Sequence, residues 1–177
     1  MKKFDLLRRH ERYDRLVNSL LEEVSTLSDE ALNRKPASGG WSAMQTMHHL
    51  ILVEVASMAY LRKKLSFNPE FKKAGLGSHL RFYLLQVSLS LPIKFRAPAP
   101  VADDKLPAYA TLADTRTRWQ EVRAEWTAFL TQMPDGLLDK EVYKHARAGK
   151  LGWGQMLGFF ETHFKRHLKQ LRAALKN

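Results

Sequence analysis

Two histidines near the carboxyl end of the chain have the residue type and spacing that could do chemistry. His163 and His167 stand four residues apart in the run HFKRH. On an α-helix this spacing places both imidazoles on one face, one turn apart. The two side chains are either packed histidines or two ligands of a divalent metal ion such as zinc or nickel, which imidazole nitrogen binds well. The helix face on which the pair lies, and the residues of the neighbouring helices, distinguish between these interpretations.

The pair lies on the apolar stripe of a predicted helix. Steps of three and four residues connect Trp153, Met156, Phe160, His163, His167, Gln170 and Ala174. A buried imidazole nitrogen without a partner costs free energy, and a metal ion would satisfy both histidines. Two ligands from one helix leave a metal site incomplete, so a third should come from a neighbouring helix.

A second helix offers that third ligand. Ser42 and Gln45 in the run WSAMQ form a capping box, which predicts a helix that begins there and runs to about Leu65. This helix carries two adjacent histidines, His48 and His49. Each belongs to a different apolar stripe, so periodicity does not choose between them. Either could face the His163–His167 pair.

Two further helices follow from the same periodicity. The first carries Leu6, His10, Tyr13, Val17, Leu20, Val24 and Leu27. The other begins near Thr111 and carries Leu112, Thr115, Trp119, Val122, Trp126, Phe129 and Met133. No strand pattern of convincing length is present, and residues 144–152 are predicted to form a loop. We therefore expect an all-α fold, a four-helix bundle.

Residues 66–111 form a long connection between the second and third bundle helices. Ser78 is predicted to cap an extra helix that Pro92 ends, because a connection of this length rarely lacks structure of its own. The proline-rich run at 94–107 is predicted to be non-helical. The predicted organisation is one domain, residues 1–177, with a long crossover that carries a short additional helix.

Composition limits the classes of function. The chain contains no cysteine, so disulfides, thiolate metal sites and cysteine nucleophiles are excluded. The net charge is +11, but basic residues occur as scattered pairs rather than as a run interleaved with aromatics, so we do not expect nucleic-acid binding. The amino-terminal run lacks an apolar signal core, and the most apolar run is too short to span a bilayer. We expect a cytoplasmic protein without membrane attachment.

The ordered combination of motifs resembles the DinB/YfiT-like superfamily of bacterial metal-binding four-helix bundles. In that family a Trp-Ser pair opens the second helix, and a histidine follows eight positions after the tryptophan. Here that position is His49 in WSAMQTMHHLILVE. A His-x-x-x-His motif near the carboxyl end, usually with a glutamine three residues on, corresponds to His163, His167 and Gln170. The similarity covers nearly the whole chain.

Other residues also resemble family features, and two depart from them. Glu54, the run KFRAP and the spacing of His145, Gly149 and Leu151 match the family pattern. Ala146 replaces a proline often found after the loop histidine, and Gly152 replaces a hydroxyl-bearing helix cap. Neither departure involves the candidate ligands. His145 and His79 lie in or beside loops and are expected to titrate as ordinary histidines.

The resemblance implies a three-histidine site for a divalent ion, zinc or nickel first, held by His49, His163 and His167. Three neutral imidazoles leave coordination positions open for water or substrate. Further residues could contact a bound water or substrate, or orient a ligand: Gln45, His48, Glu54, Gln170 and His10. For Gln45 and Gln170, helix capping or bundle-end hydrogen bonds are the competing interpretation. His10 is either a pocket or proton-transfer residue or a hydrogen-bonded core histidine.

The same resemblance implies a metal-dependent enzyme acting on a small molecule. Two chemistries follow from it: hydrolysis, or transfer and isomerisation with low-molecular-weight thiols such as bacillithiol or mycothiol. The alternatives are a bundle that binds metal or a ligand without turnover and, less favoured, a basic stress protein acting on nucleic acid. The last would require basic residues clustered on one face of the fold. A homodimer formed through apolar bundle faces is the association that such a bundle suggests.

Overall fold

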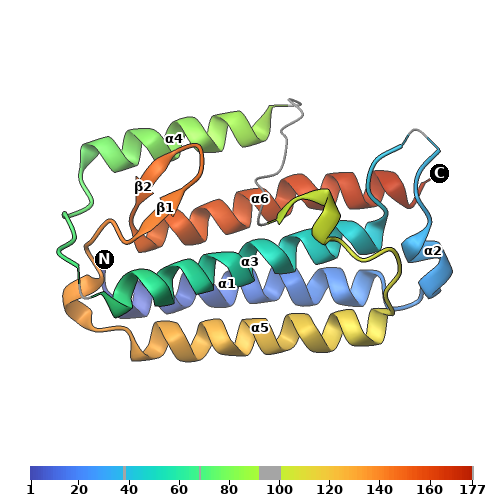
Figure 1. Cartoon of the computed structure of the whole chain (residues 1–177), viewed down its shortest axis with the longest axis horizontal. Helices are drawn as coiled ribbons and strands as arrows, with labels where there is room; N and C mark the ends of the chain where they lie inside the picture. The colour runs from blue at the N-terminus through green and yellow to red at the C-terminus, as the bar shows by residue number, and fades with distance from the viewer. Residues whose placement is uncertain (38, 68, 92–100, 177) are drawn as a thin grey trace.

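Four long helices lie side by side and form the body of the molecule (Figure 1). The structure is a computed structural model that describes residues 1–37, 39–67, 69–91 and 101–176. The bundle helices are α1 (Lys3–Glu23), α3 (Ala43–Ser66), α5 (Leu112–Gln132) and α6 (Trp153–Ala174). Both α3 and α1 pack against α5 and α6, so α6 and α5 lie at opposite corners of the bundle. This arrangement confirms the predicted all-α four-helix bundle.

The helix starts follow from local capping chemistry. Ser42 accepts a hydrogen bond from the Gln45 amide at 3.0 Å, and the Gln45 side chain accepts one from the Ser42 amide at 3.3 Å. This reciprocal pair is the predicted capping box. Thr111 caps α5 in the predicted place, and Ser28 caps the short helix α2 (Asp29–Asn33). The first turns of α2, α3 and α5 are therefore determined by capping residues that can be recognised in the sequence.

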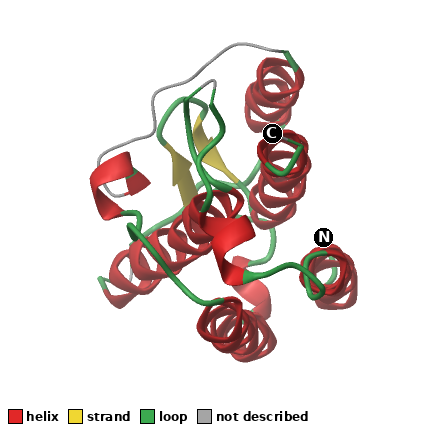
Figure 2. Ribbon diagram, turned by 90° about the vertical axis from the view of Figure 1, so that its right-hand side faces the viewer, coloured by secondary structure: helices red, strands yellow, loops and turns green. Residues whose placement is uncertain are grey.

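The crossover carries helix α4 (Leu76–Ser90), which packs on the outside of α6 (Figure 2). The helix was expected, but the predicted cap is wrong. α4 begins at Leu76 after Gly75, and Ser78 lies inside it, where its hydroxyl donates to the Gly75 carbonyl at 2.8 Å. Pro92, the predicted end, and residues 92–100 lie outside the described residues. Within 101–107 the chain forms one 3₁₀ turn, Asp103–Lys105.

The prediction of a loop before α6 is wrong, because this segment forms a short β-hairpin. Strands β1 (Tyr143–His145) and β2 (Gly149–Leu151) pair antiparallel, with Tyr143 opposite Leu151 and His145 opposite Gly149. Gly149 has φ +74°, which the tight turn requires and other residues rarely adopt. Strands of three residues are too short to show an alternating pattern, so periodicity missed them.

Aromatic side chains fill the core between the helices. Trp119, Trp126, Trp153, Phe160 and Phe164 are fully buried. On α6, Phe164 and Leu171 occupy the centre of the inward stripe, while Gln170 is exposed and His163 is partly exposed. The histidine pair consequently lies at the flank of the α6 stripe that faces α3. Among the described residues, no helix combines the length and apolarity needed to cross a bilayer.

Candidate metal centre

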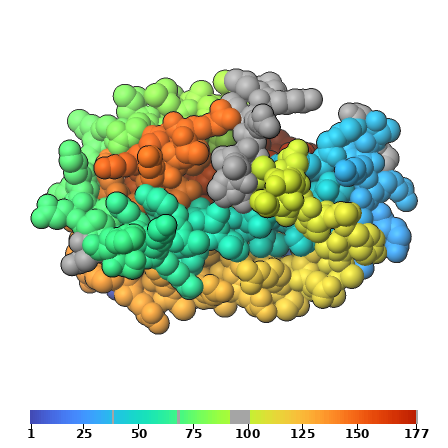
Figure 3. Space-filling model, in the orientation of Figure 1, coloured from blue at the N-terminus to red at the C-terminus, as the bar shows by residue number. Residues whose placement is uncertain are grey.

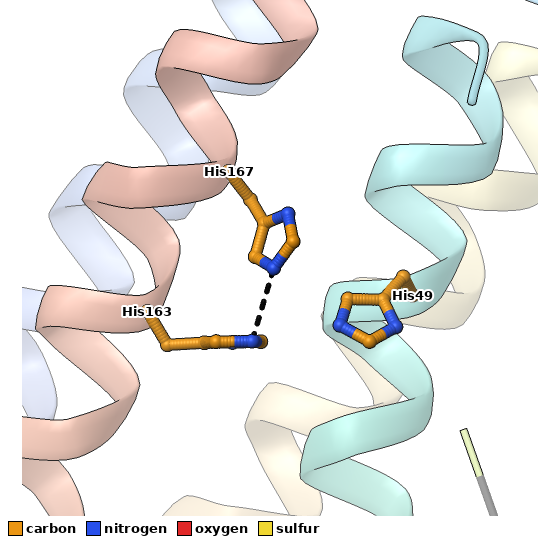
Figure 4. A group of neighbouring side chains, drawn as sticks. All are labelled: His49, His163 and His167. Atoms are coloured by element: carbon orange, nitrogen blue, oxygen red, sulfur yellow. Dashed lines mark hydrogen bonds between the residues drawn. The ribbon is translucent and has the colours of Figure 1, made fainter. Parts of the chain in front are cut away.

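Three histidines from two helices converge in the interior. His49 on α3 faces His163 and His167 on α6 (Figure 4). Each offers a ring nitrogen, and these three atoms lie within 4.8 Å of one another. His49 is 3 % exposed and His167 is 8 % exposed. The helix rotation therefore brings His49, and not His48, to the α6 pair.

Hydrogen bonds fix the tautomers of two of these rings. The Nδ1 atom of His49 lies 3.2 Å from the Val101 carbonyl oxygen, and Nδ1 of His167 lies 3.0 Å from Oε1 of Gln170. Oxygen atoms of this kind only accept, so Nδ1–H is the donor in both rings. The lone pair is thereby placed on Nε2. Metal-binding histidines are oriented in this way by an acceptor on the far nitrogen.

Burial keeps the cluster neutral. It lowers the pKa of His49 to about 4, although Val101 and Asp103 act in the opposite direction. Burial, and then the neighbouring His49, lower the pKa of His167 to about 3. The pKa of His163 falls well below its ordinary value, chiefly through burial and next through His167. Near neutral pH all three rings therefore have free lone pairs, as metal ligation requires.

The spacing of the donor atoms fits a shared ion. Nε2 of His163 and Nε2 of His167 lie 3.0 Å apart. Two nitrogens bound to one zinc ion at about 2.0–2.1 Å are separated by about 2.8–3.4 Å for N–Zn–N angles between square and tetrahedral. Three neutral imidazoles also match the ligand preference of zinc, nickel and related ions. The residues present therefore suit a divalent late transition metal.

Aromatic rings enclose the cluster on two sides. The Trp41 ring lies 4.6 Å from the His49 ring and 5.9 Å from the His167 ring, centroid to centroid. Phe159 lies 5.2 Å from His163. Our sequence interpretation assigned no site role to either residue. Phe159 stands four residues before His163, so its place on the same helix face could have revealed it.

His145 on β1 extends this aromatic wall. Its ring contacts the edge of Phe159 at 4.5 Å, and its Nδ1 accepts from the backbone N–H groups of Arg147 and Ala148. The hydrogen is therefore on Nε2. Burial, together with the charge of Arg147, lowers the pKa of His145 to about 4. The expectation that His145 titrates as an ordinary histidine is wrong, because the hairpin buries it.

Of the further candidates, Gln170 contacts a cluster histidine directly, whereas Gln45 and His48 make other contacts. The side-chain Nε2 of Gln45 donates a hydrogen bond to the Pro107 carbonyl at 3.2 Å, in addition to the capping role of this residue. Nε2 of His48 lies 3.0 Å from Oγ1 of Thr115 on α5. These bonds join α3 to the segment before α5 and to α5 itself. The capping interpretation of Gln45 is therefore the one that its contacts support.

Glu54 and His10 belong to a different buried cluster. Glu54 accepts hydrogen bonds from Tyr13 at 3.0 Å, Trp119 at 2.9 Å and Arg123 at 2.5 Å. Arg123 also contacts Nδ1 of His10 at 2.5 Å. These residues join α1, α3 and α5. The structure thus places Glu54 and His10 in contacts that hold the bundle together, and Arg123 was not predicted from the sequence as their partner.

Comparisons with known proteins agree with this architecture. A family model described as the DinB superfamily matches residues 12–171. A protein of Oceanobacillus iheyensis named "Putative metal-dependent hydrolase" is 24% identical over 160 residues, 89% of this chain and 78% of that protein. A protein of the same name from Geobacillus kaustophilus is 24% identical over 161 residues, 91% of this chain and 79% of that protein.

The solved structure of YfiT from Bacillus subtilis has a similar fold. The two chains superpose with a TM-score of 0.61 at 19% identity, over 99% of this chain and 89% of the other. YfiT is described as "a probable metal-dependent hydrolase with an unusual four-helix bundle topology". At this identity the likeness establishes the fold. The family match over residues 12–171 shows that the chain belongs to the DinB superfamily.

Proposed function

We propose that this protein is a metal-dependent hydrolase whose ion is held by His49, His163 and His167. One observation carries the proposal: three neutral imidazoles from α3 and α6 converge with their ring nitrogens within 4.8 Å. A buried cluster of this kind has no structural need for three adjacent imidazoles, because apolar side chains would fill the same volume at lower cost. Binding of a cation accounts for it.

The chain's own residues prepare the site for such an ion. Val101 and Gln170 hold the His49 and His167 rings with Nε2 free, and the surrounding apolar groups keep these rings unprotonated. A divalent ion held there supplies Lewis acidity, which polarises an oxygen of the substrate and eases deprotonation of water near neutral pH. Trp41 and Phe159 limit the access of bulk water, and they offer apolar surface to a small organic substrate.

Two further points support hydrolysis with zinc or nickel. The relatives from Oceanobacillus iheyensis and Geobacillus kaustophilus carry names that describe metal-dependent hydrolases. Neutral nitrogen donors favour late first-row ions over magnesium or calcium, which prefer oxygen ligands. The donor set suits zinc and nickel equally, so metal analysis must choose between them.

The test compares turnover in matched variants. Protein stripped with a chelator and reloaded with Zn²⁺ or Ni²⁺ should hydrolyse p-nitrophenyl acetate or p-nitrophenyl phosphate, and the rate should fall on renewed chelation. His49→Ala should lose at least about 100-fold in rate, as expected when an essential metal ligand is removed. His48→Ala is the control, since His48 contacts Thr115 and not the cluster.

Three results would contradict the proposal of a hydrolase with its ion at His49, His163 and His167. Equal rates in the His49→Ala and His48→Ala proteins would place the activity elsewhere. Turnover confined to conjugation of a low-molecular-weight thiol with monochlorobimane would indicate a thiol S-transferase. Binding of one ion without turnover of either substrate class would indicate a metal-binding bundle.

A further inference from the structure

A cavity of about 630 Å³ lies between the first half of α1 and the start of α4, over the first turn of α6. In Figure 2 these three helices follow one another along one side of the molecule, with α6 between the other two. Figure 3 shows the other side, where α3, α5 and the hairpin hide nearly all of α1. The volume is within the range of about 300–1,000 Å³ that is typical of small-molecule sites.

The cavity is separate from the candidate metal centre. Gly154, which lies in its floor, precedes His163 by two and a half turns of α6, about 14 Å along the helix axis. In the described part of the chain, the cavity is lined by residues of α1, α4 and α6 and of the segment before the hairpin, and by no histidine of the metal cluster. A ligand held here would not contact an ion at the centre.

Four arginines of α1 line one wall of the cavity: Arg8, Arg9, Arg12 and Arg15. Arg8, Arg12 and Arg15 are separated by four and three residues, so they share one face of the helix. Like charges at this spacing repel each other and destabilise a helix slightly. Helix formation therefore does not account for the row, whereas an anion in the cavity would offset the repulsion.

Three of these arginines have no carboxylate partner. Arg12 forms an ion pair with Glu161 on α6. Arg9 contacts a backbone carbonyl of α6 at 3.5 Å, and Arg8 lies over an aromatic ring of its own helix, 5.6 Å from the ring centroid. Among the described residues, no carboxylate forms an ion pair with Arg8, Arg9 or Arg15. Their N–H groups are available to a ligand.

The carboxylates that line the cavity do not neutralise these three arginines. Asp139 forms ion pairs with Lys73 and Lys140. Asp5 accepts a hydrogen bond from the backbone N–H three residues before it, at 3.3 Å. Glu11 forms no ion pair with a cation of the described residues. The guanidinium groups of the lining consequently outnumber the carboxylates, and the wall attracts anions.

The geometry of guanidinium groups and the facing wall indicate the class of anion. A guanidinium group binds phosphate through two parallel N–H···O bonds, and its planar fork suits phosphate better than a spherical ion. His79 and Phe82 of α4 lie across the cavity from the arginines, and they offer an imidazole and an aromatic ring to an organic group. A cavity enclosed by three helices admits a small molecule and not a duplex of nucleic acid.

We propose that this cavity binds a phosphate group, carried by a small organic molecule or present as the free ion. Arg8, Arg9 and Arg15 donate to the phosphate oxygens, and an organic part lies against Phe82. The site is independent of the metal centre and of the proposed hydrolysis.

Isothermal titration calorimetry of the full-length protein tests the site, with ADP, inorganic phosphate and adenosine as the probes. ADP should bind, adenosine should not, and NaCl should weaken the binding because it screens the exposed arginines. Tighter binding of ADP than of phosphate would identify a phosphate ester as the ligand, and equal affinities would identify the free ion. Removal of metal with a chelator should leave the affinity for ADP unchanged.

Variants of the unpaired arginines identify the binding wall. Arg8→Gln and Arg15→Gln should each weaken ADP binding at least about fivefold, since each removes a charge-assisted hydrogen bond. Arg34→Gln is the matched control, because Arg34 is also exposed and without an ion pair among the described residues, but lies at the end of α2. It should bind ADP within about twofold of the wild type. Glutamine is a good helix former, and circular dichroism checks that α1 remains folded.

Four results would overturn the proposal. Wild-type protein that binds neither ADP nor phosphate at millimolar concentration has no such site. Equal weakening in Arg34→Gln would show attraction by the net charge alone. Loss of ADP binding with the metal would place the phosphate on the ion. A single-stranded oligonucleotide that binds more tightly than ADP and depends on Arg8 would make nucleic acid the partner.

Discussion

At the scale of single residues, the chain uses histidine in two different buried settings. In the candidate metal centre the three rings lie together, Nε2 of His163 and Nε2 of His167 are hydrogen-bonded to each other, and no cation from the described side chains bonds to those atoms. In the second cluster, His10 meets a cation that the protein supplies itself, the Arg123 guanidinium. The first arrangement is suited to binding a cation, whereas in the second the His10 nitrogen already has Arg123 as its hydrogen-bond partner. Burial alone therefore does not distinguish a ligand from a structural histidine; the partner atoms do.

The His10 setting predicts how stability depends on pH. Burial, and then the positive charge of Arg123, lower the pKa of His10 to about 4. The unfolded chain, with an ordinary histidine pKa of about 6.5, binds more protons than the folded chain between these two values. The free energy of unfolding should thus decrease as pH falls from about 6.5 to about 4, and this contribution should be flat outside that window.

Urea unfolding of metal-free protein between pH 4 and pH 8 checks this prediction. His10→Gln can still accept from Arg123 and donate to Thr127, but it cannot titrate. Its slope between pH 4 and 6.5 should be smaller than that of the wild type by up to about 1.4 kcal/mol per pH unit. Above pH 7 the two profiles should run parallel. Identical slopes in the acid window would show that His10 is already protonated in the folded state.

At the scale of helices, the close approach of α4 to α6 depends on one glycine. A Cβ atom added at Gly158 would lie 2.5 Å from Cζ of Phe82, far inside van der Waals contact. Gly158→Ala should therefore displace the Phe82 ring and lower the free energy of unfolding by about 1–3 kcal/mol. This outcome opposes the gain that alanine normally brings to a helix interior, about 1 kcal/mol.

Thermal or urea unfolding measures this effect, with Gly136→Ala as the control. A Cβ atom at Gly136 meets nothing within 4 Å, and this glycine does not have a positive φ. The control should be within about 0.5 kcal/mol of the wild type. Should Gly158→Ala prove as stable as the wild type or more stable, the packing of α4 on α6 would be looser than the structure shows.

The elements also show which features a sequence can reveal. The starts of α3 and α5 could be predicted because Ser42 and Thr111 cap residues three positions away. The start of α4 could not, since Gly75 offers no side chain and Ser78, the obvious cap, bonds backward from inside the helix. The β-hairpin was missed because its pairing depends on the turn at Gly149 and not on a run of alternating residues.

At the scale of the whole molecule, the candidate site required contacts between distant segments. Periodicity placed His163 and His167 on one face, but the choice between His48 and His49 depends on how α3 is rotated against α6. In the structure His49 faces the α6 pair and contacts Val101, 52 residues away, whereas His48 contacts Thr115, 67 residues away. The link between Glu54 and Arg123 is equally remote, at 69 residues. Spacing within one helix cannot encode such pairs.

The whole molecule combines a rigid bundle with a site formed where two of its helices face each other. α3 contributes one histidine and α6 two, and both helices also pack on other elements that fix their positions. The ligand set would consequently be pre-arranged before any ion binds, which lowers the cost of ordering the site. The central claim is that this arrangement binds one divalent ion.

Metal content tests that claim most directly. Protein purified without a nickel column should contain about one zinc or nickel ion per chain by inductively coupled plasma mass spectrometry. His49→Ala and His163→Ala should each abolish stoichiometric metal, whereas His48→Ala, altered at the adjacent position, should retain it. Wild-type protein that remains metal-free after incubation with Zn²⁺ and Ni²⁺, or a His49→Ala variant that keeps its ion, would contradict the three-histidine centre.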